Sequence, residues 1–413
     1  MTATPNSCRF CGAVLIHTVV DLGTTPLCES YIPADKLHEQ EPVYPLRVFV
    51  CDRCFLVQLP AHVGGEEIFT EYAYFSSYSD SWLAHAERYA AAMIERLGLD
   101  GTSQVVEVAS NDGYLLQYFL QRGIPAMGIE PAANVARVAA AKDIPTLVEF
   151  FGRDSAARLV ARGIRADLLV GNNVLAQVPD VNDFVAGLAL VLRPGGVLTL
   201  ECPHLMRLVE ENQFDTIYHE HYSYFSLLSA TAILSAHGLT VFDVEELPTH
   251  GGSLRIHACH AADAAHPATE RVAAMRVLEE SAGLDRLAYY ASFEGRVRET
   301  KRRLLEFLES ARNSGKRVAG YGAPGKGNTL LNYCGIGADL LEYTVDRNPY
   351  KQGKFLPGSR IPIFSPERID ETRPDYLLIL PWNLREEIMS QMGRIRAWGG
   401  QFVVPIPSLR ICP

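Results

Sequence analysis

A four-residue segment, Tyr218-His219-Glu220-His221, carries side chains of the types that move protons. The imidazole of His221 can accept a proton near neutral pH, and the carboxylate of Glu220 can orient or polarise an imidazole. The phenol of Tyr218 can donate a hydrogen bond to a developing negative charge. Two other interpretations are a polar loop that caps the following helix (residues 227–238) and a metal site at His219 and His221. The metal site would lack a third ligand and the i, i+4 spacing of zinc-binding helices.

Four of the nine cysteines form two closely spaced pairs. Cys8 and Cys11 lie in CRFC, and Cys51 and Cys54 lie in CDRC, with 39 residues between the pairs. Two such turns can complete a closed tetrahedral zinc site, which folds a segment too small for its own core. We therefore expect structural zinc in a module covering residues 1–70, with two disulfides as the alternative. The remaining cysteines are scattered and are expected to be free thiols in a reducing compartment: Cys28, Cys202, Cys259, Cys334 and Cys412.

A turn suited to nucleotide binding follows an apolar run in the first half of the chain. In VVEVASNDGYLL, Glu107 lies on an expected strand, and the small or turn-forming Ala109, Asn111 and Gly113 lead directly into a helix. Such a turn brings the backbone close to a ligand at the helix N-terminus. Glu130 ends the next expected strand, where a carboxylate can accept hydrogen bonds from both hydroxyls of a ribose.

The order of the elements after this turn is also informative. A buried strand ending at Asn172 and Asn173 is followed by a helix, an RPGG turn and another apolar strand. This order resembles that of the class I S-adenosylmethionine methyltransferases, over roughly residues 75–260. In the first turn, Ala109 and Asn111 stand where glycine is commoner in that superfamily. The resemblance implies cofactor contacts from six residues: Glu107, Ala109, Asn111, Gly113, Glu130 and Asn173.

A second glycine-rich turn occurs in the last third of the chain. In KRVAGYGAPGKGN, Gly320, Gly322 and Gly325 satisfy the pattern GxGxxG, and Asp346 ends the next expected strand. The pattern fits a dinucleotide and hence an NAD-dependent oxidoreductase, but such a turn at the start of a helix binds phosphate of any kind. Residues 316–360 hold seven Lys or Arg against three Asp or Glu, an excess that suits a diphosphate.

The remaining patterns indicate how these segments are arranged. Residues 83–98 are expected to form a helix, and residues 264–312 an amphipathic helical connection. The predicted fold class is α/β in three parts. These are a zinc module (1–70), a Rossmann-like cofactor domain (71–262), and the helical connection with a second Rossmann-like domain (263–413). The cleft that carries the chemistry should lie between them.

Composition excludes several classes of protein. The 413 residues are 48% hydrophobic and 21% charged, as in a folded globular protein of several domains. The net charge of −10 argues against broad binding to nucleic acid or to an anionic membrane. The start MTATPNSCRFC has no signal-peptide pattern, and no run of about 18 apolar residues occurs, so a cytoplasmic location is expected. A small molecule is the expected ligand, and no protein partner is predicted.

Several motifs together resemble the sugar C-methyltransferases of deoxysugar and antibiotic biosynthesis. They are the two cysteine pairs, EYAYFSSYS (71–79), EVASNDGYLL, FDTIYHEHYSYFS (214–226), THGGSLR (249–255) and GYGAPGKGNTLLNYCGI (320–336). Members of that family have a zinc-binding N-terminal module, a central methyltransferase domain and a C-terminal Rossmann-like domain. The resemblance implies transfer of a methyl group from S-adenosylmethionine to a carbon, mostly C3, of a nucleotide-activated 4-keto-deoxysugar. The nucleotide expected is dTDP.

The resemblance also implies roles for individual residues. Tyr218, Glu220 and His221 would be active-site residues, and Tyr72 would line the same cavity, with simple packing as its alternative. Carbon methylation needs a nucleophilic carbon, which a base can create by removing the proton beside a ketone. Trp382 would stack on the base or sugar, or else lie in the core. The sugar nucleotide would be held by the C-terminal half, through Gly322, Lys326, Asn328, Asn348 and Lys351.

One position departs from the family's pattern. Gln177 stands where many of these enzymes have histidine. An amide can hydrogen-bond a sugar substituent but cannot exchange a proton near neutral pH, which leaves the C3 substituent of the substrate open. Three other functions stay open at this point: the oxidoreductase, a noncatalytic S-adenosylmethionine-binding protein, and a methyltransferase acting on another acceptor.

Overall fold

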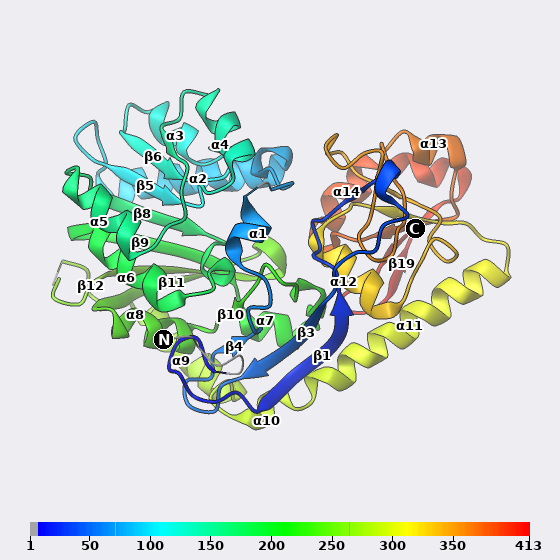
Figure 1. Cartoon of the computed structure of the whole chain (residues 1–413), viewed down its shortest axis with the longest axis horizontal. Helices are drawn as coiled ribbons and strands as arrows, with labels where there is room; N and C mark the ends of the chain where they lie inside the picture. Colours follow the sequence, from blue (N-terminus) through cyan, green and yellow to red (C-terminus); the bar gives the residue numbers. More distant parts are fainter. Residues whose placement is uncertain (1–6, 71, 264) are drawn as a thin grey trace.

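The computed structural model describes residues 7–70, 72–263 and 265–413. Figure 1 shows two α/β lobes side by side, with β1 (His17–Thr25) and β3 (Tyr44–Val50) passing beneath and between them. None of the helices in this described part of the chain is long and apolar enough to cross a membrane.

The N-terminal segment forms a four-stranded antiparallel sheet in the order β1-β3-β4-β10. Its third strand is β4 (Val57–Gln58), whereas its fourth, β10 (Ser223–Tyr224), comes from the middle of the chain. A shorter antiparallel pair joins β2 (Ile32–Pro33) to β15 (Lys354–Phe355). The module predicted from residues 1–70 is therefore paired through its backbone with both of the later segments.

A seven-stranded sheet in the order β11-β12-β9-β8-β5-β6-β7 forms the first lobe. Its strands are β5 (Val105–Val108), β6 (Ala126–Ile129), β7 (Thr146–Leu147), β8 (Ala166–Asn172), β9 (Leu192–Pro203), β11 (Leu239–Leu247) and β12 (Ser253–His260). The strands from β9 to β7 run parallel, and β12 lies antiparallel between β9 and β11. This is the predicted class I methyltransferase arrangement. Successive strands are added on one side of β5 as far as β7 and then, from β8, on its other side, so a ligand site is expected at the carboxyl ends of β5 and β8.

Helices cover both faces of this sheet (Figure 1). The helix predicted at residues 83–98 is α2 (Asp80–Leu97). Ser79 caps its first turn by accepting a hydrogen bond from the Trp82 backbone N–H, and Gly98 ends it with a φ of 61°. The other helices before residue 240 are α1 (Gly65–Phe69), α3 (Leu116–Leu120), α4 (Ala133–Ala140), α5 (Arg153–Ala161), α6 (Val181–Val191), α7 (Leu205–Glu210) and α8 (Leu227–Ala236).

The second lobe is a six-stranded sheet in the order β16-β14-β13-β17-β18-β19. Its strands are β13 (Val318–Tyr321), β14 (Thr344–Val345), β16 (Ile363–Phe364), β17 (Tyr376–Ile379), β18 (Gln401–Val404) and β19 (Arg410–Cys412). All are parallel except β19, and the order reverses at β13, which the glycine-rich turn follows. The helices of this half are α9 (Glu270–Ala282), α10 (Leu287–Tyr290), α11 (Phe293–Asn313), α12 (Gly325–Cys334), α13 (Arg368–Thr372) and α14 (Arg385–Gln391).

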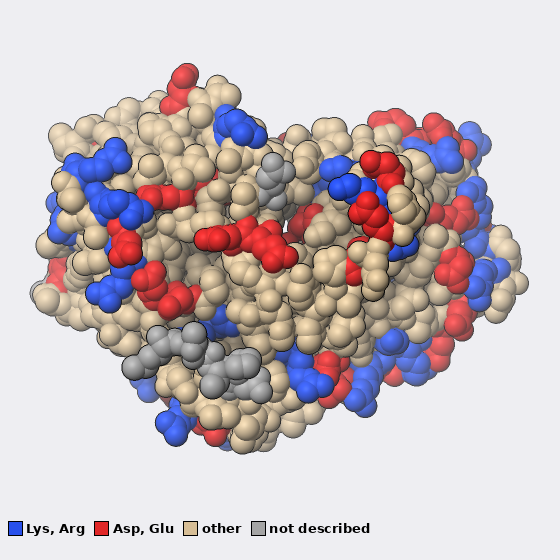
Figure 2. All heavy atoms as spheres, in the orientation of Figure 1, with Lys and Arg blue, Asp and Glu red and all other residues tan. Residues whose placement is uncertain are grey.

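One hydrophobic core joins the N-terminal sheet to the second lobe. Val20 and Val48 of the N-terminal sheet, Leu304 of α11 and Leu330 of α12 are buried in the same cluster. The surface of α11 is charged, and Arg302 pairs with glutamates one turn away on either side. Figure 2 shows Lys and Arg interspersed with Asp and Glu over the face drawn there. The helical connection that was expected to be amphipathic therefore has a charged outer face and a buried apolar face at α11.

Candidate active site

A cavity of about 1260 Å³ lies where the three parts of the chain meet. Its wall includes the turns that follow β5 and β8, the segment before β10, and the glycine-rich turn that follows β13. A typical small-molecule pocket measures about 300–1,000 Å³. The volume therefore has room for two ligands, one at each Rossmann-like sheet.

His221 lies in the segment between a 3-10 turn (Phe214–Thr216) and β10, and it lines the cavity. Its Nδ1 is 2.9 Å from the backbone oxygen of Thr216. Because a carbonyl can only accept, Nδ1 carries the proton and Nε2 is left as an acceptor. Burial lowers the pKa of His221 to about 3, so the ring is neutral at pH 7. The site thus contains an uncharged base with one free nitrogen.

Tyr218 packs against this imidazole, with ring centroids 4.1 Å apart and planes inclined by 34°. Its side chain lines the cavity, and its hydroxyl makes no hydrogen bond with the described residues. Burial raises the pKa of Tyr218 well above its usual value, so the phenol keeps its proton. Tyr218 is therefore a free hydrogen-bond donor beside the base.

Glu220 contacts a different neighbour from the one that its sequence position suggested. Its Oε2 accepts a hydrogen bond from the Tyr72 hydroxyl at 2.8 Å, and its Oε1 accepts one from the Cys28 thiol at 3.4 Å. The Thr216 carbonyl, and not this carboxylate, orients His221. Burial raises the pKa of Glu220 to about 7. The geometry corrects the idea that Glu220 orients the imidazole and joins it to Tyr72 instead.

His219 points away from the cavity. Its Nε2 lies 3.2 Å from the backbone oxygen of Pro45, and its ring packs edge-on against Tyr44 at 5.8 Å between centroids. Neither His219 nor His221 belongs to a group of three metal-ligating side chains in the described part of the chain. The alternative of a metal site in this segment is therefore not supported.

The turn after β5 is strained. Ala109 and Asn111 have positive φ angles of 57° and 51°, and Gly113 has one of 76°. This conformation costs a non-glycine residue roughly 1–2 kcal/mol. Ala109 and Asn111 line the cavity, whereas Gly113 packs behind its wall, where a Cβ would lie 2.1 Å from Ile144 Cδ1. Strain of this kind persists where the surrounding structure fixes the backbone around a ligand site.

Glu130 follows β6 and lines the cavity next to this turn. Its Oε2 accepts a hydrogen bond from the Asn111 backbone N–H at 2.9 Å, and its Oε1 accepts one from that of Ala132 at 2.8 Å. Each carboxylate oxygen has a further lone pair, so both can still accept from a ribose hydroxyl. Asn173 lines the same wall, but Glu107 is fully buried on β5 behind it. The members of this set that line the cavity fit the ribose end of S-adenosylmethionine.

The second lobe contributes two buried cations to the cavity wall. Lys326, in the first turn of α12, donates to the His250 backbone oxygen at 3.2 Å, and burial lowers its pKa to about 8. Lys351 donates to the Ala323 backbone oxygen at 2.9 Å and lies 3.3 Å from a carboxylate oxygen of Glu29. Three other residues expected to bind substrate also line the cavity: Gln177, Gly322 and Asn348.

Two of the residues expected to bind substrate lie outside this wall. Trp382 is buried, and its Nε1 donates to Asp215 Oδ2 at 2.7 Å beneath the ammonium of Lys326. Asn328 is also buried, and its Nδ2 donates to the Cys28 backbone oxygen at 2.6 Å. The core alternative for Trp382 is therefore the correct one, and Asn328 anchors the N-terminal segment to α12.

The Lys and Arg side chains of residues 316–360 are spread over the second lobe, and only some of them face the cavity. Lys316 pairs with Asp375, Arg317 with Glu342, and Arg360 lies near Glu41, all at the surface. Of the seven basic residues in this range, those that line the cavity are Lys326, Arg347 and Lys351. The local net charge therefore overstated the positive charge available to a diphosphate.

Several cavity residues carry little signal in the sequence. Glu29, Trp82, His85 and Arg255 line the cavity from three separate segments of the chain. His250 belongs to the THGGSLR motif, but its residue type alone did not indicate a role. A histidine followed by two glycines was the available signal, because such a sequence favours a tight loop that presents a polar side chain.

The four paired cysteines converge in the N-terminal segment. Their sulfur atoms lie within 4.8 Å of one another, with 3.5 Å between Cys8 and Cys54 and 3.5 Å between Cys11 and Cys51. None of these four cysteines forms a disulfide, and the pairs that approach most closely are not those within each CxxC unit. The predicted disulfide alternative therefore fails, and four sulfurs at these separations fit one tetrahedral zinc ion.

Three family models match successive parts of the chain. They are described as “Putative zinc binding domain” (residues 8–69), “Methyltransferase domain” (82–244) and “C-methyltransferase C-terminal domain” (248–407). The C-methyltransferase NovU of Streptomyces niveus is 38% identical over 406 residues, which is 98% of this chain and 96% of that protein.

Two solved structures have some likeness to part of the chain. Magnesium protoporphyrin IX methyltransferase of Synechocystis PCC 6803, with bound SAH, is 16% identical and has a TM-score of 0.35 over 43% of this chain and 82% of its own. A SAM-dependent methyltransferase of Anabaena variabilis is 15% identical, with a TM-score of 0.36 over 43% of this chain and 86% of its own.

The region matched by the methyltransferase domain contains the strained turn and Glu130, beside the point where the order of the seven-stranded sheet reverses, and the chain is an S-adenosylmethionine-dependent methyltransferase. The glycine-rich turn of the second lobe lies within the region matched by the C-methyltransferase C-terminal domain, so the oxidoreductase alternative is wrong. Because NovU matches almost the whole of both chains, this chain belongs to the C-methyltransferase family.

Cofactor affinity should depend on pH through Glu130. Burial raises the pKa of this carboxyl to about 7, and its ionised form is the better acceptor for ribose hydroxyls. Lowering the pH from about 8 to about 6 should therefore weaken S-adenosylhomocysteine binding by about tenfold in calorimetry. Glu130→Gln should bind more weakly at the higher pH and lose most of this dependence. Unchanged affinity in that variant would refute the assignment.

Proposed function

We propose that the protein methylates a carbon beside the ketone, C3 being the expected one, of a nucleotide-linked 4-keto-deoxysugar. The observation that carries the proposal is the placement of a neutral base and a free phenol in one cavity between two Rossmann-like sheets. His221 and Tyr218 supply the base and the phenol, and Glu130 marks the cofactor end. The glycine-rich turn and Lys326 lie at the opposite end of the cavity, where the sugar nucleotide would bind.

The chain's own residues can carry the first chemical step. His221 Nε2 takes the proton from the carbon beside the ketone, and the electron pair left behind is delocalised onto the ketone oxygen as an enolate. Tyr218 donates a hydrogen bond to that oxygen, and the ammonium of Lys326 adds positive potential nearby. Bound S-adenosylmethionine supplies an electrophilic methyl group. The Thr216 carbonyl holds the imidazole proton on Nδ1, which keeps Nε2 available.

The second lobe supports binding of the sugar nucleotide. Gly322 has a φ of 90°, and a Cβ there would lie 2.5 Å from Pro381, so the turn needs glycine. The first turn of α12 follows it, and unpaired backbone N–H groups at such a position attract phosphate oxygens. Lys351 and Asn348 border the same part of the cavity. We assign the diphosphate of the substrate, with dTDP as the expected nucleotide, to this end.

Gln177 bears on the sugar itself. It lines the cavity in the 3-10 turn (Leu175–Gln177) that follows β8, and no described residue hydrogen-bonds its side chain. The free amide can donate to and accept from a hydroxyl or amino substituent at C3 but cannot relay its proton. Proton transfer is therefore assigned to His221 alone.

The test is a panel of nucleotide 4-ketosugars incubated with the purified protein and labelled S-adenosylmethionine. Members should differ in nucleotide and in the C3 substituent, and NMR should locate the new methyl group. Transfer to a carbon beside the ketone supports the proposal and identifies that carbon. Absence of transfer to every ketosugar, with cofactor binding intact, would contradict it.

The rate of methyl transfer should rise with pH through about 7, because Glu220 has a pKa of about 7 and His221 does not titrate there. The ionised Glu220 is the better acceptor for the Tyr72 hydroxyl, and we assign the faster form of the enzyme to this charge-assisted contact in the cavity wall. Glu220→Gln should be slower than the wild type above pH 7, and its kcat/KM should no longer rise with pH through about 7. If the rise of kcat/KM with pH persists unchanged in Glu220→Gln, another group is responsible for it.

A further inference from the structure

The loop at residues 249–252 brings a second imidazole, that of His250, into the cavity wall. The loop joins β11 to β12 and has three successive residues with positive φ: His250 at 55°, Gly251 at 91° and Gly252 at 114°. Glycine adopts such angles freely, whereas histidine pays roughly 1–2 kcal/mol. The surroundings must therefore hold this histidine in place.

Contacts from both lobes fix its position. The ammonium of Lys326 donates to the His250 backbone oxygen at 3.2 Å, and the imidazole packs edge-on against Trp82 with centroids 5.0 Å apart. On the other side, a Cβ at Gly251 would lie 2.5 Å from the ring of Trp382, so the loop is pressed against the second lobe. His250 thus lies at the boundary between the lobes.

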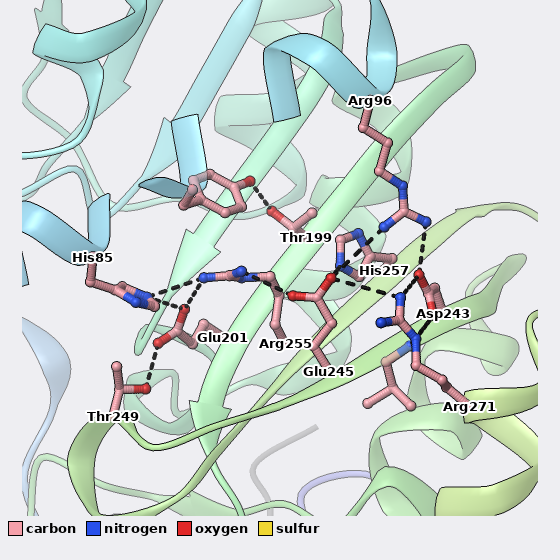
Figure 3. A network of polar contacts seen from close by, with 12 residues as sticks. His85, Arg96, Thr199, Glu201, Asp243, Glu245, Thr249, Arg255, His257 and Arg271 are labelled. Carbon is pink, nitrogen blue, oxygen red and sulfur yellow. Dashed lines mark hydrogen bonds and ion pairs between the residues drawn. The ribbon is translucent and has the colours of Figure 1, made fainter. Parts of the chain in front are cut away.

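The residue before His250 is anchored to a network of ion pairs (Figure 3). The Thr249 hydroxyl donates to Glu201 Oε1 at 2.8 Å, and Glu201 Oε2 lies 3.0 Å from His85 and 3.1 Å from Arg255. Burial raises the pKa of Glu201, but His85 and Arg255 outweigh it, so the net value is below the usual one. A buried carboxylate that stays ionised therefore fixes the base of the loop.

The hydrogen bonds of His250 determine which ring nitrogen carries the proton. Nε2 lies 3.1 Å from Nδ2 of Asn173, an amide nitrogen that can only donate. Nε2 therefore accepts, and the neutral ring carries its proton on Nδ1, which has no partner among the described residues. Burial, followed by the charge of Lys326, lowers the pKa of His250 to about 4. The cavity wall thus contains an uncharged N–H donor whose hydrogen bond no described residue accepts.

The Nδ1–H of His250 lies between the cofactor end of the cavity and the part that contains His221. Asn173, its hydrogen-bond partner, follows β8 at the edge of the sheet where the cofactor turn lies. His221, Lys326 and His250 line the same cavity, and the ammonium of Lys326 donates to the backbone oxygen of His250. A ligand atom between His221 and the cofactor edge would therefore lie close to His250.

We propose that His250 is a second catalytic imidazole, whose Nδ1–H donates a hydrogen bond to the ketone oxygen as it becomes an enolate. The inference rests on the proposed function. In this step the C–H bond beside the ketone breaks and its proton goes to Nε2 of His221. The C–H electron pair forms the C=C bond, and the carbonyl π pair moves onto oxygen. A neutral imidazole can polarise such an oxygen without protonating it, and it acts there with Tyr218.

Two variants compatible with a positive φ test the donor. His250→Gly removes the side chain, and His250→Asn keeps an amide N–H near the position of Nδ1. With ketosugar and S-adenosylhomocysteine in D₂O, His250→Gly should lower proton exchange by about 10²–10³-fold, and methyl transfer should fall with it. His250→Asn should recover exchange to within about tenfold of the wild type. Both variants should bind S-adenosylhomocysteine as the wild type does.

Exchange by His250→Gly close to the wild-type rate would overturn the inference. So would a folded, cofactor-binding His250→Asn that is no faster than His250→Gly, or methyl transfer lost with exchange intact. A readout without sugar is ¹⁵N NMR of the full chain with S-adenosylhomocysteine. A neutral Nδ1–H tautomer of His250 near pH 7 supports the inference, and a charged ring or an Nε2–H tautomer overturns it. If the wild type neither exchanges nor methylates any ketosugar, the proposed function itself fails, whatever the tautomer.

Discussion

Replacing His221 by asparagine should lower both proton exchange and methyl transfer by about 10²–10⁴-fold, the usual contribution of a positioned acid–base group. The structure leaves Nε2 of His221 as the free acceptor beside Tyr218, and asparagine offers no comparable base. Exchange would be followed by NMR in D₂O with S-adenosylhomocysteine, and transfer with labelled S-adenosylmethionine. Binding of both ligands should remain, because His221 is assigned no contact that holds either of them.

His219→Asn is the matched control. It removes an imidazole from the same segment, but one that faces Pro45 and Tyr44 outside the cavity. This variant should keep exchange and transfer near wild-type rates once folded. Full methylation by His221→Asn would move the base to another cavity residue such as Tyr72 and leave the reaction class standing.

Loss of one zinc ligand should have the second large effect, on folding. Zinc binding to closed cysteine sites is worth on the order of 10 kcal/mol, comparable with the whole stability of a domain of about 5–15 kcal/mol. Cys51→Ser should therefore give protein that is largely insoluble or unfolds at much lower temperature. Metal analysis of the wild type should find about one zinc per chain. Catalysis should fall only in proportion to the folded fraction.

Cys412→Ser is the control for this substitution. Cys412 lies on β19, outside the four-cysteine cluster, and should be replaceable with little change in melting temperature or zinc content. Soluble, active and metal-free wild-type protein would contradict the structural role of zinc. A selective loss of transfer in folded Cys51→Ser would contradict it in another way, by giving the metal a part in the reaction.

Much of the architecture could be predicted because it depends on patterns among residues close together in the sequence. The apolar strands with small residues after them indicated both Rossmann-like sheets, and the spacing of Cys8, Cys11, Cys51 and Cys54 indicated their convergence. Helix α2 was predicted to within a few residues because its hydrophobic face and Gly98 are both local signals. These features depend on neighbours in the chain.

The contacts that position the site could not be predicted because they join distant segments. The carbonyl that orients His221 belongs to Thr216 in the same loop, but its direction depends on the turn and not on residue type. Trp382 follows a strand where a ligand was expected, yet Asp215 satisfies its N–H in the core. His250 is held by Asn173 and Lys326, each at least 75 residues away in the chain.

The pairing of β10 with β4 has a consequence for recombining such enzymes. The register joins Ser223 to Gln58 and Tyr224 to Val57, directly after the segment that carries His221. In a chimera that takes its first 70 residues from one parent and the rest from another, β4 and β10 would come from different parents. The two parental sequences would then have to pair within a single sheet. Exchange of acceptor specificity by whole-module shuffling would therefore succeed only when both paired strands come from the same parent. Point substitutions in the cavity wall are the more practical route.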